Sequence, residues 1–214
     1  NIDSITSSRG SANLTIDNAT LTANSIGAKD GDSKNSLSSY LQKGGNVKTG
    51  SLYVGGTQSS TKQDLLVEGG TLTVATDTNP QKGILSVGGN LYLTQGATLA
   101  YEGSSKESTS QLSVGGKMNI ADDSKVTLSR DAVANITQLE VEKGTLTAGT
   151  GSKITTENYT QGNDATDVNV ATIAVGLDDG SYNINGGKFT VNNQLTGTLA
   201  TGGGSGVNYN QTGG

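Results

Sequence analysis

The sequence of 214 residues contains no cysteine, no histidine and no tryptophan, and it has a single proline. Without cysteine there can be no disulfide, no thiol nucleophile and no zinc–thiolate site. Without histidine, the commonest general base and a common metal ligand are both missing. The only aromatic residues are seven tyrosines and one phenylalanine, so a core must be built mainly from aliphatic side chains. These absences leave few routes to enzymatic chemistry.

Charge and hydropathy exclude further classes of protein. The net charge is −5, the pI is about 4.7 and there is no basic cluster, which argues against nucleic acid as a partner. No apolar run approaches the length that spans a membrane. The apolar fraction is only 31%, but the 32 glycines bring it near that of a folded domain. The first residues include neither an initiator Met nor the apolar stretch of a signal peptide, so we expect a fragment of a longer protein.

One phrase is written twice, as LSVGGNLYLTQGATL from Leu85 and as LSVGGKMNIADDSKV from Leu112. A third segment, LEVEKGTLTAGTGSKITTENYTQ, begins at Leu139, which is as far from Leu112 as Leu112 is from Leu85. Each segment offers three short pairs of apolar residues at positions i and i+2, with turn residues between the pairs. A period of two indicates strands with one buried face. The equal spacing predicts that Leu85, Leu112 and Leu139 form one aliphatic column.

Three short strands in each repeat favour a three-sided coil. Coils stacked about 4.8 Å apart would pair each strand with its counterpart in the next coil. We therefore predict an all-β fold, a parallel β-helix of roughly 8–10 coils, with residues 1–214 forming a single repeat domain. Glycine pairs fit the corners, and Pro80 stands in a loop-like segment. An antiparallel sandwich or barrel explains the alternation equally well, but it requires no fixed spacing.

The pattern extends beyond these three segments. Further copies begin at Leu52 and Leu65, and LTIDNATLTA and INGGKFTVNNQLTGTL carry it near the two ends. Residues 22–39 and 161–168 do not keep the register, and we expect them to be loops that project from the rod. A second recurrent phrase, Tyr-x-Gln, occurs at residues 40–42, 159–161 and 209–211.

Several of these phrases together resemble the passenger domains of bacterial autotransporters, in particular self-associating and diffuse-adherence adhesins. The phrases are LYVGG, LLVEGGTLTV, LSVGGNLYLTQGATL and NYNQTGG, and they are distributed over most of the chain. The resemblance implies a rod that is secreted or anchored at the bacterial outer membrane, with a translocating barrel elsewhere in the full protein. A cysteine-free chain fits such an export route. The resemblance transfers no functional residue, because adhesive faces in this family have no short motif.

The phrase GDSKNS at 31–36 is similar to the surroundings of a serine-protease nucleophile, and some autotransporter passengers do carry a protease. The catalytic triad of that class needs a histidine base, which this chain lacks. We therefore interpret GDSKNS as a solvated loop.

Two acidic pairs, Asp122-Asp123 and Asp178-Asp179, are candidates for cleavage of polysaccharides, because some parallel β-helices are pectin-degrading enzymes. Adjacent residues of a strand face opposite ways, however, and both pairs stand in turn-like contexts, ADDSK and LDDGS. The pattern favours a turn role for all four residues.

The segment KDGDSKN at 29–35 is similar to a calcium loop through Asp30 and Asp32. Lys34 stands where the next oxygen ligand is needed, and no Glu closes the loop. We therefore predict no metal site. Five Asn-x-Thr sequons are present, but several arise by chance in a chain this rich in Asn and Thr. They begin at Asn13, Asn18, Asn135, Asn158 and Asn210.

These observations predict no catalytic residue, no cofactor and no metal ligand. We expect a non-enzymatic segment of a bacterial surface adhesin, acting as a stalk and as a contact surface. Its expected partners are a second copy of itself or a host-surface protein or glycan, with no nucleic acid and no membrane insertion of this segment. Outward Thr, Ser and Asn would either keep the β-surface soluble or pair with an identical neighbour. The alternatives are a polysaccharide lyase or glycosidase on the same fold, and the spacer or cell-binding part of a secreted toxin.

Overall fold

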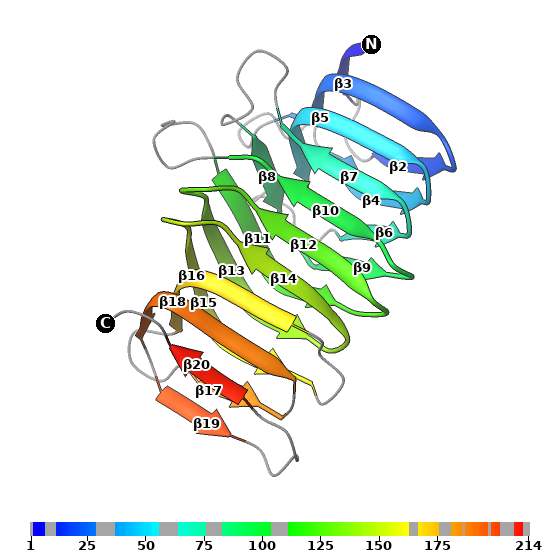
Figure 1. Ribbon diagram of the computed structural model, residues 1–214. Coiled ribbons are helices and arrows are strands. Elements are labelled where there is room, and N and C mark those ends of the chain that lie inside the picture. The colour runs from blue at the N-terminus through cyan, green and yellow to red at the C-terminus, as the bar shows by residue number, and fades with distance from the viewer. Residues whose placement is uncertain are drawn as a thin grey trace.

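The computed structural model describes residues 2–6, 12–28, 37–55, 64–75, 83–103, 111–162, 167–175, 181–185, 187–196, 198–201 and 208–211. Its regular elements in these residues are all β-strands, and every pairing between them is parallel (Figure 1). In chain order they are β1 (Ile2–Ile5), β2 (Ala12–Asp17), β3 (Thr20–Ile26), β4 (Leu37–Lys43), β5 (Asn46–Val54), β6 (Leu65–Glu68), β7 (Thr71–Val74), β8 (Ile84–Val87), β9 (Leu91–Thr94), β10 (Thr98–Tyr101), β11 (Gln111–Ile120), β12 (Ser124–Leu128), β13 (Val133–Val141), β14 (Gly144–Ala148), β15 (Lys153–Gln161), β16 (Asp167–Val175), β17 (Ser181–Ile184), β18 (Lys188–Thr196), β19 (Thr198–Thr201) and β20 (Asn208–Gln211).

The strands stack in three columns, one on each side of a β-solenoid, and the long strands bend to contribute to two columns. The first column, which faces the viewer in Figure 1, contains β7, β10, β12, β14 and β20 and the first halves of β3, β5, β16 and β18. The second contains β1 and β8, the first halves of β11, β13 and β15, and the second halves of β3, β5, β16 and β18. The third contains β2, β4, β6, β9, β17 and β19 and the second halves of β11, β13 and β15.

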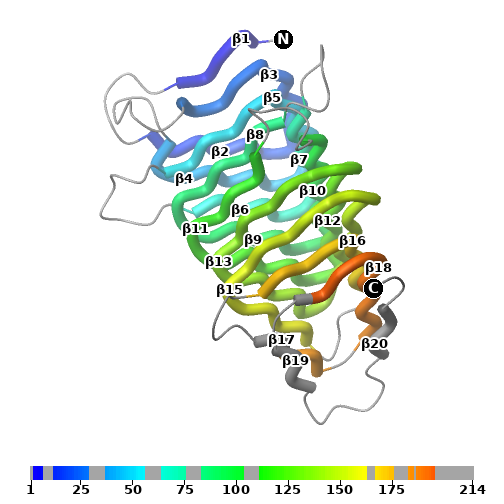
Figure 2. Tube along the Cα trace, turned by 90° about the vertical axis from the view of Figure 1, so that its left-hand side faces the viewer, coloured from blue at the N-terminus to red at the C-terminus, as the bar shows by residue number. Residues whose placement is uncertain are grey.

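The predicted parallel β-helix is therefore confirmed. Six coils with a strand on each side run from Asn46 to Ile184, and strands of the same columns extend the stack at both ends (Figure 2). With these additional strands, the first column holds nine stacked segments within the described residues.

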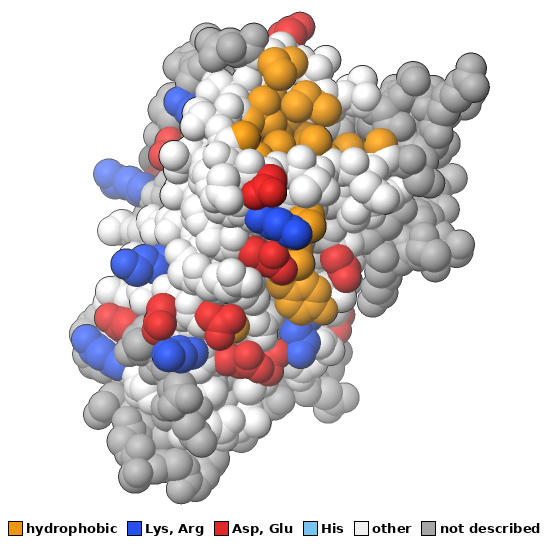
Figure 3. Space-filling model, turned by 90° about the vertical axis from the view of Figure 1, so that its right-hand side faces the viewer, with side chains coloured by type: hydrophobic (Ala, Val, Ile, Leu, Met, Phe, Trp, Pro, Cys, Tyr) orange, Lys and Arg blue, Asp and Glu red, His pale blue; other side chains and the backbone are white. Residues whose placement is uncertain are grey.

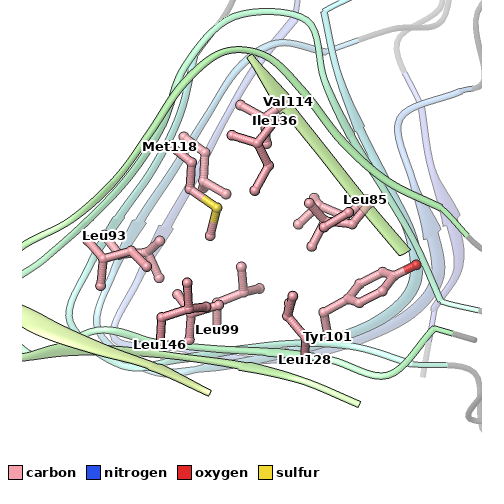
Figure 4. Close-up of a cluster of buried hydrophobic side chains, with 14 of the residues drawn as sticks. Leu85, Leu93, Leu99, Tyr101, Val114, Met118, Leu128, Ile136 and Leu146 are labelled. Atoms are coloured by element: carbon pink, nitrogen blue, oxygen red, sulfur yellow. The ribbon is translucent and has the colours of Figure 1, made fainter. Parts of the chain in front are cut away.

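The core fills the inside of the three-sided coil. Because side chains alternate along a strand, each strand sends every second residue inward. Labelled side chains from all three sides, such as Leu85, Met118 and Leu99, converge in Figure 4. Leu85 and Leu99 are fully buried, and Met118 is 1% exposed. The scarcity of aromatic residues matches this interior, in which most positions are filled by Leu, Val, Ile and Ala.

The predicted column of Leu85, Leu112 and Leu139 is only partly right. Leu85 pairs with Leu112 in the second column, as expected. Leu112, however, pairs with Ala134 on its other side, and Leu139 pairs with Met118 in the third column. The reason is that the coil shortens, because the step along the chain from Leu112 to Ala134 is smaller than the step from Leu85 to Leu112. Leu139 is still buried in the core, but on a different side of the coil.

Glycine pairs do occupy corners, for two different physical reasons. At the corner between the third and first columns, Gly69 and Gly70 have φ angles of 76° and 71°, a region that favours glycine. At the corner between the second and third columns, Gly115 has no positive φ but packs closely on the preceding coil. A Cβ atom there would lie 2.7 Å from the carbonyl oxygen of Gly88.

The Tyr-x-Gln phrase places a polar pair inside the core. The Tyr40 hydroxyl donates a hydrogen bond of 2.9 Å to Gln42 Oε1, and Tyr159 donates one of 2.7 Å to Gln161 Oε1. Both glutamines are fully buried. Gln42 Nε2 in turn donates to the Thr71 carbonyl oxygen at 3.1 Å, so the buried amide is satisfied. The third copy lies in β20, whose side chains are outside the described set.

The two predicted projecting loops included residues that belong to strands. Residues 22–26 belong to β3 and residues 37–39 to β4, and both segments keep the stacking register. Likewise, Gln161 ends β15 and Asp167 begins β16. Residues 29–36 and 163–166, which make up most of the rest of the two predicted loops, lie outside the described residues, as does Pro80.

Candidate functional site

The outer surface of the third column carries a row of three hydrophobic side chains, which we call the apolar ladder. Leu41, Leu66 and Tyr92 come from β4, β6 and β9 and are direct neighbours in the strand register. All three are partly exposed, whereas the residues on either side of each are buried. They therefore occupy outward positions, which in most of this solenoid hold polar residues.

The same column continues, beyond Tyr92, into a shallow groove of about 260 Å³. We call it the polar groove. Its lining side chains stand in two adjacent rows on β11, β13, β15 and β17. One row holds Lys117, Gln138 and Asn158, and the other holds Glu140, Thr160 and Asn183; the buried Leu139 also contributes to the lining.

An ion pair crosses the groove between neighbouring coils. Lys117 Nζ lies 2.6 Å from Glu140 Oε2, and the Asn119 amide donates a weaker hydrogen bond of 3.4 Å to the same oxygen. The hydrogen bond to Glu140 raises the pKa of Lys117 above its ordinary value. The raised pKa keeps Lys117 charged at neutral pH, and its one partner among the lining residues is a carboxylate, so the ion pair leaves the groove without net charge.

Side-chain hydrogen bonds between coils fix the corner at which the chain enters the third column. The Asn90 backbone N–H donates to Asp64 Oδ1 at 2.7 Å, and the Lys117 backbone N–H donates to Asn90 Oδ1 at 2.8 Å. Each coil thus fixes the corner of the next one through an Asp or Asn oxygen. The backbone of Lys117 is consequently tied to the preceding coil through Asn90, which is itself tied to the coil before it.

A row of charged residues runs beside the apolar ladder. Asp17, Lys43 and Glu68 are register neighbours on β2, β4 and β6, so their signs alternate along the axis. Figure 3 shows one side of the molecule, on which hydrophobic side chains and charged side chains of both signs lie close together. The third column combines the three kinds of contact that recognition sites use: apolar, charged and hydrogen-bonding.

The structure supports the turn interpretation of Asp122-Asp123. Both residues have positive φ, 53° and 62°, in the turn between β11 and β12. This is the corner at which earlier coils use glycine, and Asp and Asn adopt that conformation more readily than other residues with a side chain. The Asp123 carboxylate lies 3.6 Å from Lys143 Nζ, and both side chains are more than half exposed.

Several other candidates lie outside the described residues. These are GDSKNS at 31–36, the calcium-like segment at 29–35 with Asp30, Asp32 and Lys34, and Asp178-Asp179. Among the sequons, Asn135 and Asn158 are exposed on strands, and Asn18 is at a corner with a φ of 47°. The Asn13 side chain accepts a hydrogen bond from Ser39, and the side chain of Asn210 is not among those described. Glycosylation of any of them stays a prediction.

No group of three or more acidic side chains in the described ranges is arranged to hold a metal ion. The same ranges include no helix of membrane-spanning length and hydropathy. The comparisons with known proteins add no further direction: no family model, no curated protein and no solved structure matches this chain.

Sequence reasoning missed the apolar ladder and the polar groove. The ladder did leave a signal, because Leu65-Leu66-Val67 and Leu91-Tyr92-Leu93 are runs of three apolar residues where strict alternation would put a polar one in the middle. The groove left none, because Gln, Asn, Thr, Lys and Glu are ordinary residues at outward strand positions. Only the register of the coils brings them side by side.

Proposed function

We propose that this chain is a non-enzymatic segment of a bacterial surface adhesin, acting as both stalk and contact surface. The observation that carries the proposal is the third column, whose inward residues are buried from β4 to β15 while its outward residues form an apolar ladder followed by a polar groove. A repeating scaffold with one differentiated side suits recognition of an extended partner. The resemblance of several phrases to autotransporter passengers supports the same class.

The proposed contact is weak for each molecule, and its strength comes from the number of molecules that bind together. The apolar ladder offers only three partly exposed side chains, and the remaining contacts available are hydrogen bonds from polar groups. Such a surface suits many copies acting together on one cell, because linked weak contacts raise the overall avidity. Export to the bacterial surface would provide this arrangement.

A test uses latex beads coated with the whole chain at several densities. We expect the beads to clump together or to adhere to cultured epithelial cells, with a steep dependence on density. Beads coated to the same density with the heat-denatured protein are the control for non-specific stickiness. If coated beads stay dispersed and bind no better than this control, the adhesin proposal is wrong.

The enzymatic alternative is tested with the same protein. Incubation with polygalacturonate and with neutral polysaccharides should release no new reducing or unsaturated ends. Turnover that disappears in a double variant, Asp122→Asn with Asp123→Asn, would replace the adhesin proposal with a polysaccharide-cleaving enzyme.

A further inference from the structure

The polar groove contains hydrogen-bonding groups that the fold itself does not use. The side chains of Gln138, Asn158, Thr160 and Asn183 line it, and none of them makes a hydrogen bond with another residue that the structure describes. Three of the four are amides, each of which presents both donors and an acceptor. Together they offer paired donors and acceptors on adjacent coils.

Outward polar groups elsewhere on the solenoid often satisfy each other instead. Asn192 donates to Asn169 at 2.6 Å and Asn193 donates to Thr172 at 3.0 Å, in each case to a strand of the adjacent coil. Asn24 donates to Asp3 in the same way at 2.7 Å. Stacked Asn and Thr side chains are therefore able to pair between coils in this fold. The polar side chains of the groove are also adjacent, but they do not pair with one another, so their donors and acceptors are available to a ligand.

The charge of the groove indicates what kind of ligand it suits. Among its lining residues the one cation, Lys117, is already paired with the one anion, Glu140, at 2.6 Å. An anionic ligand would have to compete with Glu140 for the lysine, and a cationic one with the lysine for Glu140. A neutral ligand rich in hydroxyl groups meets no such competition and can bond to the ion pair and the amides together.

The apolar ladder provides the second half of the site. Tyr92 lies one coil before Asn119 and two before the groove residue Glu140 in the same row, so its partly exposed ring stands on the line that leads into the groove. Leu66 and Leu41 continue the apolar surface away from the groove. Sugars combine these two demands, because one side of a pyranose ring presents C–H groups that pack on aromatic rings while its rim presents hydroxyls.

We propose that the polar groove and Tyr92 form a binding site for a neutral oligosaccharide that lies along the solenoid axis. Successive sugar rings would meet successive coils, the first on Tyr92 and the next between the amides of the groove. The groove, at about 260 Å³, is smaller than the roughly 300–1,000 Å³ usual for the clefts and cavities that bind small molecules, so it holds a short stretch of the sugar chain at a time. This inference rests on the proposed function and deepens it, since the glycan would belong to the opposing cell surface.

The first experiment applies the whole chain to an array of neutral and acidic oligosaccharides. We expect binding to at least one neutral compound, which is then titrated in solution while the backbone amide signals are followed by NMR. Signals of Gln138, Asn158 and Thr160 should shift, while those of outward residues on the first column should not. No neutral binder on the array, binding of acidic compounds alone, or shifts elsewhere on the molecule would overturn the proposal.

Two matched aromatic variants then test the site. Tyr92→Ala should weaken binding of the neutral oligosaccharide by about tenfold. Tyr53→Ala is the control, because Tyr53 is also a partly exposed outward tyrosine, but it lies in the second column on β5. A third variant, Asn158→Ala, removes one groove amide and should weaken binding without altering the Tyr92 contact. Circular dichroism spectra establish that each variant is folded, and equal effects of Tyr92→Ala and Tyr53→Ala would contradict the assignment.

The two proposals fail separately. Beads that adhere equally well to enzymatically deglycosylated cells, from a protein that binds no neutral oligosaccharide, would leave the adhesin function standing and remove the sugar site. Oligosaccharide binding in solution without any bead adhesion would leave the sugar site standing and remove the adhesin function.

Discussion

The inner and outer rows of the third column follow different rules. From β4 to β15 the inner row is buried at every coil, as in Leu65 and Leu91, and the Tyr-x-Gln pairs are its only polar insertions in that stretch. The outer row is apolar at Leu66 and Tyr92 and then changes to polar residues along the same strand register. Stacking thus constrains what points inward, whereas the outward residues are free to vary. Function has to be sought in that variation.

The largest expected effect is on stability, and it distinguishes two neighbouring residues of β6, one in the inner row and one in the outer row. Leu65→Ala empties a fully buried position and should cost about 2–5 kcal/mol of unfolding free energy. Leu66→Ala removes the same number of atoms from a partly exposed position and should cost under about 1 kcal/mol. Urea unfolding followed by circular dichroism measures both. Similar losses for the two variants would show that Leu66 packs as a core residue.

The next comparison is between two corners. Gly70 has a φ of 71°, and a Cβ atom there would lie 2.3 Å from the Gly45 carbonyl oxygen. Gly96 has a φ of 72°, but no heavy atom lies within 4 Å of its Cβ position. Gly96→Ala should therefore cost only the backbone strain, about 1–2 kcal/mol. Gly70→Ala should cost clearly more, because the clash adds to the strain; equal melting temperatures would contradict the close stacking of corners.

A smaller effect depends on pH and concerns the polar insertion in the inner row. Burial raises the pKa of Tyr40 far above its ordinary value of 10.0. Folding therefore keeps the phenol protonated at a pH where the unfolded chain releases the proton, so the contribution of Tyr40 to stability is constant below about pH 10 and falls above it. In Tyr40→Phe, this fall above about pH 10 should be reduced, as measured by urea midpoints. An unchanged slope would mean that Tyr40 is open to solvent.

The smallest effect belongs to the outer row. Lys117→Met removes the ion pair with Glu140, whose side chains are 39% and 21% exposed. Surface ion pairs contribute about 0–1 kcal/mol, and salt screens them. We expect a loss in that range at low salt that shrinks in concentrated NaCl. A loss of several kcal/mol would place Lys117 in the structural framework rather than on a surface that is available for binding.

The architecture was predictable because it depends on the inner row. The i, i+2 apolar pairs and the second copy at Leu112 predict parallel stacking, and the register of Leu85 with Leu112 confirms it. The third copy was misplaced because the pairs on all three sides look alike in sequence. Once the coil shortens after Leu112, Leu139-x-Val141 still resembles the second-column pairs but lies in the third column. Spacing alone does not tell one side from another.

The candidate site was not predictable, for the opposite reason. Its residues are outward ones, so no periodicity identifies them, and Gln138 and Asn158 are distant in sequence yet direct neighbours in register. Asp122-Asp123, in contrast, was interpreted correctly as a turn, since its chemistry and its ADDSK context agree. A polar row on a solenoid becomes visible only when the length of each coil is known.

The stacking has a mechanical consequence. In the described residues, each strand pairs only with strands of the coil before or after it, as β11 does with β8 and β13. No strand among them bridges distant coils, so a pull on the two ends loads the coils in series. We expect such a rod to yield one coil at a time, each adding roughly 60–90 Å of extended chain. If the chain tethers a cell, as we propose, that cell would be decelerated in steps under flow before the tether is lost.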